Sequence, residues 1–401
     1  MKKITCAMQN AIKNQKSKIT SCLLAFFFCL PVISQPLERI SMELSGLDPR
    51  QMLYADSVIM QAIADNEMPG AVLAVIHKGK MAYLRAYGYR QIYPSRLPME
   101  VNTVFDLASV SKSVATAIST MILVERGKLR LTDRVSMYIP NFRGNIRIID
   151  LLTHRSGLPS YASVAALSQE FDLPNPDALI EYIATVDRLF DPGERVQYGC
   201  LNFITLQRII ETVSGQKLED FAQKNIFDVL GMKSTGFRPE GEVLARTAPT
   251  ERQADGSVLH GVVHDPLARL VNDGNSGNAG LFSDADDLAI LAVALLNGGT
   301  YNGKRLMSPL GVQTMTSISP LMMQSGRTPG WDASSFIRSD LLSERTFGHT
   351  GYTGTSMVID PENDIAIILL SNRVHPTDDG NLARVRAVVA NIVAAAIIRS
   401  N

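Results

Sequence analysis

Strand patterns stand near both ends of this chain, and they constrain its fold more than any other feature of the sequence. Apolar residues dominate 71–76 and 81–87, and the segment between them, His77-Lys78-Gly79-Lys80, is typical of a tight hairpin turn. Near the other end, two more strand patterns, 356–359 and 365–370, flank a turn sequence of Pro, Glu, Asn and Asp. We therefore expect an α+β fold, in which both chain ends build one mainly antiparallel β-sheet that helices flank.

Helical periodicity covers most of the chain outside these strands. Apolar residues recur at helical spacing in several segments. These segments are 49–66, 109–127, 177–186, 202–213, 217–230, 285–296 and 382–398. The stretch of about 128–280 is the richest in helical patterns and in Gly and Pro turns. We expect a helical insertion subdomain there, within one domain that spans 35–401.

Residues 1–34 have the features of a signal peptide. Lysines without any acidic residue precede an apolar core at 22–33, which is too short to span a bilayer. Cleavage after Ser34 would leave a mature chain whose sole cysteine is Cys200, so no internal disulfide can form. We expect a periplasmic or otherwise exported protein. The long basic start leaves an uncleaved anchor open, and only that anchor would bring membrane contact.

Charge excludes one class of partner, because the 39 basic and 39 acidic residues among 401 give a formal net charge of zero. A balanced chain lacks the basic excess that nucleic-acid binding requires, so we expect no nucleic-acid partner. The sequence leaves the oligomeric state open.

The motif Ser109-Val110-Ser111-Lys112 opens an apolar helical pattern. Residues three apart on a helix lie about one turn apart on one face, so Ser109 Oγ can meet Lys112 Nζ in one pocket. At a helix start the backbone N–H is free, and the positive end of the helix dipole favours an oxyanion. The motif alone is weak: a helix N-cap is the alternative, and a second match, Ser214-Gly215-Gln216-Lys217, falls where a helix ends and indicates a turn.

Two later segments add chemistry to this motif. Tyr198 stands at the entry to a helix, and a tyrosine beside a lysine ammonium can act as a base. Near the C-terminus, the strand pattern carries the sequence Gly348-His349-Thr350-Gly351. Glycines inside a strand mark the close approach of another backbone or of a ligand. This pattern predicts a strand edge that lines a pocket.

Together these segments resemble the serine β-lactamase and penicillin-binding-protein superfamily, closest to its class C-like branch and its penicillin-binding-protein-4B-like group. Five pieces carry the likeness, in the order and spacing of the family. They are Ser109 to Lys112 (S-x-x-K), 151–158 (LLTHRSGL), Tyr198 (the tyrosine of Y-x-N), the pair 261–265 and 278–282, and His349-Thr350-Gly351 (the H-T-G form of K-T-G). The likeness covers about 50–398 and implies a β-lactamase/transpeptidase-like fold.

The resemblance also implies catalytic roles. Ser109 would attack a carbonyl, while Lys112 and Tyr198 would share the proton shuttle that activates first the serine and later a water. The backbone N–H groups of Ser109 and Tyr352 would form the oxyanion hole. The family's reaction needs no metal and no organic cofactor.

Substrate-binding residues follow from the same resemblance, with one departure from it. His349, Thr350 and Gly351 would orient the substrate. The family expects an asparagine at position 200, where this chain has Cys200, and a thiol replaces an amide poorly as a hydrogen-bonding group. Asn202 is the nearest amide, although on a helix it points elsewhere. Cys200 and Asn202 are both kept as candidate substrate-binding residues.

These inferences predict an exported serine hydrolase that forms an acyl-enzyme on Ser109. Its expected partner is a small molecule or a cell-wall peptide. We expect it to act on D-alanyl peptides, as a DD-carboxypeptidase does, or on small esters. Two alternatives stay open, a class C-like β-lactamase and a non-catalytic penicillin-binding sensor.

Overall fold

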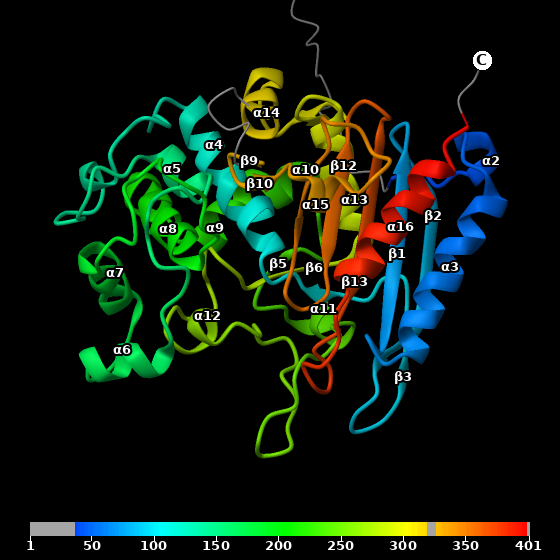
Figure 1. The fold of residues 1–401 in the computed structure, drawn as a ribbon, viewed down its shortest axis with the longest axis horizontal. Helices are drawn as coiled ribbons and strands as arrows, with labels where there is room; N and C mark the ends of the chain where they lie inside the picture. The colour runs from blue at the N-terminus through cyan, green and yellow to red at the C-terminus, as the bar shows by residue number, and fades with distance from the viewer. Residues whose placement is uncertain (1–36, 319–325, 399–401) are drawn as a thin grey trace, which may run out of the picture. The chain divides into compact units, whose positions relative to one another are not determined.

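The strand patterns of the two chain ends meet in one eight-stranded antiparallel sheet in the computed structural model (Figure 1). The structure describes residues 37–318 and 326–398, so the expected signal peptide, residues 1–34, lies outside the described residues. The strand order is β3 (Leu97–Pro98), β2 (Lys80–Gln91), β1 (Gly70–His77), β13 (Ile365–Ser371), β12 (Ser356–Asp360), β11 (Phe347–Thr350), β10 (Trp331–Asp332) and β9 (Arg327–Thr328). Because β1 pairs directly with β13, both chain ends build the sheet, and the prediction of this α+β fold is confirmed.

The turn between β1 and β2 has the backbone that its sequence predicts. Lys78 and Gly79 both have positive φ, at 52° and 72°, as a two-residue hairpin turn of type I′ requires. Alternate residues of β1 face opposite sides of the sheet. Val72 and Ala74 belong to one hydrophobic core, and Leu73 to the other. The sheet is therefore covered on both faces.

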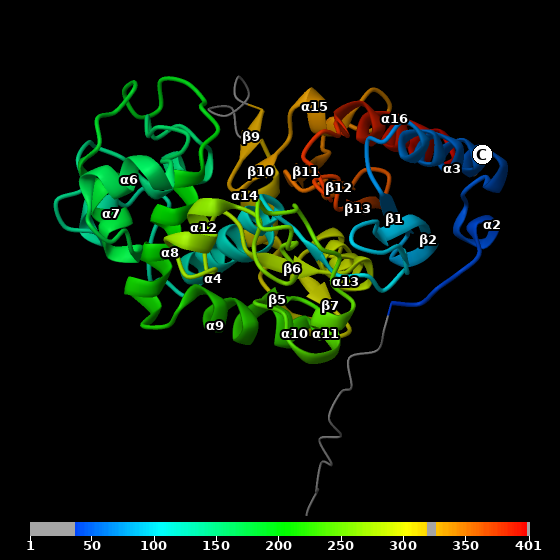
Figure 2. The same ribbon diagram turned by 90° about the horizontal axis from the view of Figure 1, so that it is seen from below.

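Helices from distant parts of the chain form the two outer layers. Helices α3 (Pro49–Ala64) and α16 (Ala383–Ala395) lie side by side on one face of the sheet, as Figures 1 and 2 show. Helix α13 (Ala285–Leu296) packs on the opposite face, against β1, β12 and β13. The groove described below lies among the residues of β11, the nucleophile motif and the start of α16.

The regular elements of segment 128–280 are helices, apart from one short strand, β5 (Gly236–Phe237). Its helices are α5 (Ile148–Leu152), α6 (Val164–Glu170), α7 (Pro176–Thr185), α8 (Cys200–Ser214), α9 (Leu218–Ala222), α10 (Asp228–Leu230), α11 (Gly241–Ala245) and α12 (Pro266–Leu270), with a 3-10 turn at Val135–Met137. A π-helical turn, Gln223–Phe227, interrupts the helix expected at 217–230. Helix α8 ends at Gly215, whose φ is 69°, so the second S-x-x-K sequence is a turn, as expected.

A second, three-stranded sheet leads into the nucleophile motif. Its strands are β4 (Phe105–Asp106), β6 (Leu281–Ser283) and β5, with β6 in the middle. The helix expected from Ser109 to Gly127 is a π-helix over Lys112–Ala117 followed by α4 (Ile118–Glu125). Single π-helical turns inside helices occur often at functional sites.

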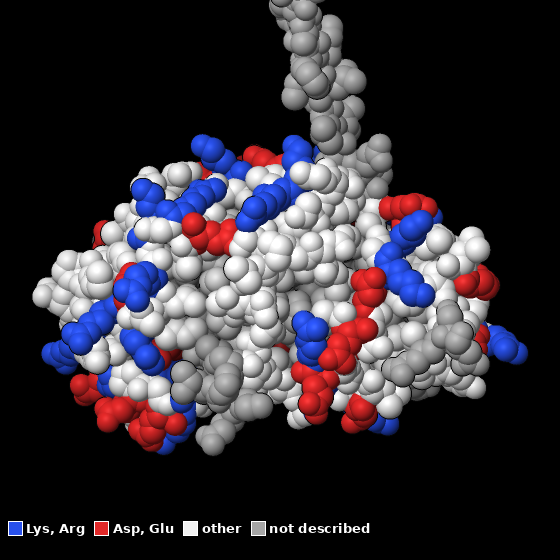
Figure 3. All heavy atoms as spheres, turned by 90° about the horizontal axis from the view of Figure 1, so that it is seen from above, with Lys and Arg blue, Asp and Glu red and all other residues white. Residues whose placement is uncertain are grey.

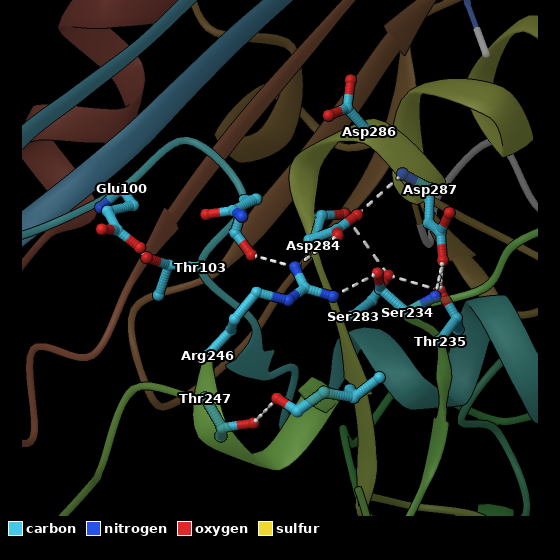
Figure 4. Close-up of polar contacts among 12 residues, drawn as sticks. Glu100, Thr103, Ser234, Thr235, Arg246, Thr247, Ser283, Asp284, Asp286 and Asp287 are labelled. Atoms are coloured by element: carbon cyan, nitrogen blue, oxygen red, sulfur yellow. Dashed lines mark hydrogen bonds and ion pairs between the residues drawn. The ribbon is translucent and has the colours of Figure 1, made fainter. Parts of the chain in front are cut away.

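A buried polar cluster joins this second sheet to the start of α13 (Figure 4). The carboxylate of Asp287 accepts hydrogen bonds from the backbone N–H of Ser234 at 2.7 Å and from Thr235 Oγ1 at 2.8 Å. Asp284 caps α13 by accepting from the Asp287 N–H at 3.0 Å, and Arg246 lies 3.4 Å from its carboxylate. Two carboxylates thus share one buried, hydrogen-bonded environment.

The remaining described elements are short helices and one hairpin. They are α2 (Met42–Ser45), the hairpin β7 (Thr300–Tyr301) and β8 (Lys304–Arg305), α14 (Pro309–Thr316) and α15 (Ser335–Arg338). On the face shown in Figure 3, basic and acidic side chains are interspersed. Within residues 37–318 and 326–398, no helix has both the length and the hydropathy that crossing a membrane requires.

Candidate active site

Ser109 stands at a sharp turn between strand β4 and the π-helix. The preceding residue, Ala108, has a φ of 45°, in the left-handed region that residues other than glycine adopt at a cost. The Asp106 carboxylate holds this turn by accepting the Ala108 N–H at 2.8 Å and the His264 N–H at 2.7 Å. The turn presents Ser109 to a groove that it helps to line.

Lys112 is fully buried beside Ser109, and its ammonium group has three acceptors for its three protons. Its Nζ donates to Ser109 Oγ at 2.9 Å, to the Asn278 carbonyl at 2.9 Å and to Cys200 Sγ at 3.6 Å. Burial lowers the pKa of Lys112, but the ionised forms of Cys200 and Tyr198 favour the ammonium, and the net effect is a raised pKa. Lys112 is therefore a charged ammonium that donates hydrogen bonds in the resting site.

The aromatic ring of Tyr198 lies between two cationic side chains. Its centroid is 5.2 Å from Lys112 Nζ and 5.4 Å from the guanidinium of Arg327. The ring of His154 packs at 4.5 Å and that of His349 at 6.0 Å. The structure thus brings together Ser109, Lys112 and Tyr198, the three residues whose meeting the sequence predicted.

Six of the nine predicted site residues line one groove of about 510 Å³. Those that line it are Ser109, Tyr198, His349, Thr350, Gly351 and Tyr352. Within the described part of the chain, the backbone N–H groups of Ser109 and Tyr352 donate no hydrogen bond. Two free N–H groups in one groove with a serine hydroxyl can stabilise an oxyanion.

His349 is buried and uncharged at neutral pH. Burial, together with the nearby cations Arg327 and Lys112, lowers its pKa to about 3. Its Nδ1 donates to the Thr350 carbonyl at 2.8 Å, since a carbonyl oxygen only accepts. Nε2 is therefore the unprotonated nitrogen, and among the described residues it has no hydrogen-bond partner.

Three arginines line the groove and supply the positive charge that His349 lacks. Arg327 belongs to β9, Arg386 to α16, and Arg373 follows β13. No motif in the sequence marked them, because they are far apart and the fold alone brings them together. Arg327 pairs with Asp332 at 3.1 Å and Arg373 pairs with Asp378 at 2.5 Å.

The two candidates at the start of α8 lie in different places. Cys200 is half-buried and contacts Lys112, but is not among the residues that line the groove. Asn202 is fully buried, where its Oδ1 accepts from Ser156 Oγ at 2.5 Å and its Nδ2 lies 3.3 Å from His154 Nδ1. Two residues of helix turn Asn202 from the groove toward His154, so the structure does not bring this side chain to the groove.

The carbonyl of Asn278, shortly before β6, accepts from Lys112 and is a site feature that the sequence reasoning missed. A backbone acceptor carries no residue-type signal, so only the fold could reveal it. Among residues 37–318 and 326–398, no group of three or more His, Cys, Asp or Glu side chains is arranged to hold a metal ion.

Comparison with known proteins shows the family to which the chain belongs. The family model described as "Beta-lactamase" matches residues 55–391. A Bacillus subtilis (strain 168) protein named "N-acetylmuramyl-L-alanine amidase" is 33% identical over 371 residues, 84% of each chain. An Escherichia coli (strain K12) protein named "Putative D-alanyl-D-alanine carboxypeptidase" is 32% identical over 375 residues, 84% of this chain and 86% of that one. The solved structure of "EstCE1, a hydrolase with promiscuous acyltransferase activity" has the same fold, with a TM-score of 0.70 at 22% identity over 86% of this chain and 99% of that chain.

Proposed function

Because the chain belongs to the β-lactamase family of serine hydrolases, as its motifs predicted, we propose that it forms an acyl-enzyme on Ser109. One observation carries the proposal: Ser109 Oγ lies 2.9 Å from Lys112 Nζ, and the ring of Tyr198 lies 5.2 Å from the same nitrogen. A hydroxyl held by a lysine, beside a phenol, is the arrangement that nucleophilic catalysis by serine needs.

The proposed reaction proceeds in two steps. Ser109 Oγ attacks a carbonyl carbon, its proton passes to the oxygen of Tyr198 beside the Lys112 ammonium, and the oxyanion forms between the N–H groups of Ser109 and Tyr352. The leaving group takes the proton and departs, which leaves an ester on Ser109. A water then attacks that ester through the same groups, and the released acid restores the serine.

We propose D-alanyl peptides or small esters as substrates rather than β-lactams. The names of the two relatives describe enzymes that cleave amide bonds to alanine, which supports a peptide. The uncharged His349 supports an ester, because the H-T-G motif itself then offers no charge to a substrate carboxylate. Cys200, in place of the family's amide, argues against efficient β-lactam hydrolysis.

Export of the protein is a further part of the proposal, based on the lysines and the apolar core of residues 1–34. N-terminal sequencing of protein recovered from the periplasm tests it. A mature N-terminus at Gln35 is the expected result, and an intact Met1 in the membrane fraction would indicate the uncleaved anchor.

The nucleophile is tested by comparing wild type with Ser109→Ala on a short-chain p-nitrophenyl ester, a D-Ala-D-Ala peptide and a penicillin. Intact-protein mass spectrometry follows the adduct on each. We expect turnover and an adduct in wild type and neither in Ser109→Ala, with unchanged thermal unfolding. Hydrolysis retained by Ser109→Ala would overturn the proposal. An adduct that never hydrolyses would favour the sensor alternative.

A further inference from the structure

Arg386 is a groove-lining arginine without an acidic partner among the described residues. Its Nη2 donates to two backbone carbonyls, that of Gly351 at 2.8 Å and that of Thr355 at 3.0 Å. Burial and the neighbouring Arg373 lower the pKa of Arg386 to about 10, so it stays charged at neutral pH. Burying a charged side chain costs free energy, so a partly buried arginine whose hydrogen bonds go to two backbone carbonyls is expected to have a role beyond surface solubility.

The Gly351 carbonyl belongs to the same peptide group as the N–H of Tyr352. That peptide is trans and planar, so its C=O and N–H point in opposite directions. Fixing the carbonyl oxygen on Arg386 therefore fixes the direction of the Tyr352 N–H. This N–H is one of the two free donors in the groove.

The loop that carries this peptide is also attached to the segment before Ser109. Thr353 Oγ1 donates to the Asp106 carbonyl at 2.7 Å, and Thr355 Oγ1 donates to the Leu107 carbonyl at 2.9 Å. A Cβ on Gly351 would meet Thr355 Oγ1 at 2.1 Å, so only glycine allows this approach. These bonds set the distance between the two free donors, whereas the bond from Arg386 sets the orientation of one of them.

We infer that Arg386 is a positioning residue, which orients the Gly351–Tyr352 peptide so that the Tyr352 N–H meets the oxyanion. A charged donor makes a stronger bond than a neutral one, and it polarises the peptide whose N–H must donate. The inference rests on the proposed function, because an oxyanion hole matters only if a carbonyl is attacked.

A purely structural role, tying α16 to the β11–β12 loop, is the competing explanation. The two roles differ in one measurable way. A thionoester forms a sulfur anion, which is larger and accepts hydrogen bonds more weakly than oxygen, so an oxyanion hole favours the oxygen ester. A residue that orients the hole changes the ratio of oxygen-ester to thionoester rates, whereas a structural tie changes both rates alike.

The experiment measures that ratio for a matched ester and thionoester in wild type, Arg386→Met, Arg386→Lys and Arg188→Met. Arg188 is the matched control, because it also donates only to backbone carbonyls and its pKa is also lowered by burial to about 10, but it does not line the groove. Removing a whole oxyanion donor costs about 100-fold in rate or more, so we expect the ratio to fall about tenfold in Arg386→Met. Arg386→Lys keeps a charged donor and the fold, so it should recover part of the wild-type ratio.

The possible outcomes separate the inference from the proposed function. A lowered ratio in Arg386→Met with an unchanged ratio in Arg188→Met supports the inference. If wild type hydrolyses both esters and neither Arg386 variant changes the ratio, Arg386 is only a structural tie. If wild type acts on neither ester and forms no adduct on Ser109, the proposed function fails and the inference fails with it.

Discussion

Lys112 Nζ lies 3.6 Å from Cys200 Sγ, at the position where the family's asparagine is expected. Its other two bonds, to Ser109 and to Asn278, are 2.9 Å long and end on oxygen. Because sulfur accepts weakly, Cys200 leaves one proton of the ammonium poorly bound. This departure from the family therefore concerns the proton shuttle as well as the substrate amide.

The first prediction concerns Cys200→Asn. Wild type should form a penicillin adduct on Ser109 that hydrolyses slowly. The asparagine restores an oxygen acceptor and an amide donor, so we expect acylation by penicillin to become about tenfold faster, the value of one good hydrogen bond. Time-resolved intact-protein mass spectrometry measures the adduct. Cys200→Ala is the control and should show no gain, and fast ring opening by wild type without an adduct would contradict the prediction.

A second prediction separates the hydroxyl of Tyr198 from its ring. Tyr198→Phe keeps the packing on His154 and the contact with Lys112, so the folded protein should be as stable as wild type. Loss of the proton-transferring hydroxyl should lower kcat by about 100-fold or more. Ester hydrolysis and thermal unfolding, measured on the same preparation, check both parts. Unchanged kcat would remove Tyr198 from the shuttle.

Much of the fold could be predicted because long strands and tight turns leave local patterns. The hairpin at Lys78 and Gly79 and the strands β12 and β13 were all predicted from apolar runs and turn residues. Strands β3, β9 and β10 have two residues each, which is too short for any periodicity to show. The π-helix at Lys112–Ala117 could not be distinguished from an α-helix, since all six of its residues are buried and no exposed face marks its period.

The site residues could be predicted where a motif fixed the residue type. They could not be predicted where only the fold brings residues together. Ser109, Lys112 and Tyr198 were found from their motifs, and the structure brings them together. Asn202 lies off the groove on Ser156, as its helical spacing from position 200 indicated. Arg386 was missed, because its role depends on two carbonyls that are distant in sequence.

The buried pair at the start of α13 predicts a pH-dependent stability. Burial, and then Asp284, raise the pKa of Asp287 to about 7, against about 3.9 for an unfolded aspartate. The folded state therefore binds an extra proton between about pH 4 and pH 7, so this carboxyl favours folding at low pH and loses that effect as pH rises.

Asp287→Asn should remove this dependence while keeping an acceptor for Ser234 and Thr235. Relative to wild type, we expect the free energy of unfolding of the variant to rise by on the order of 2 kcal/mol between pH 4 and pH 8. Urea unfolding across that range measures it. Asp286→Asn, at an exposed neighbour paired with Arg39, is the control and should keep the wild-type profile. If the free energy of unfolding of Asp287→Asn changes with pH as that of wild type does, the pair does not titrate in this range.

His349 predicts the opposite pH dependence. Burial, with Arg327 and Lys112 nearby, lowers its pKa to about 3, against about 6.5 in the unfolded chain. Between these values the unfolded state binds the extra proton, so the free energy of unfolding falls as the pH is lowered from about 6.5. Between pH 7 and pH 5, the free energy of unfolding of His349→Gln should therefore fall by about 1 to 2 kcal/mol less than that of wild type.

Urea unfolding of wild type and His349→Gln at pH 7 and pH 5 measures this difference. Ser109→Ala is the control, because it alters the same groove without removing a titrating group, and it should retain the full acid sensitivity of wild type. If His349→Gln is as acid-sensitive as wild type, His349 accepts a proton in the folded state. It would then carry a positive charge in the groove at mildly acidic pH, and carboxylate capture by the H-T-G motif would have to be restored to the mechanism.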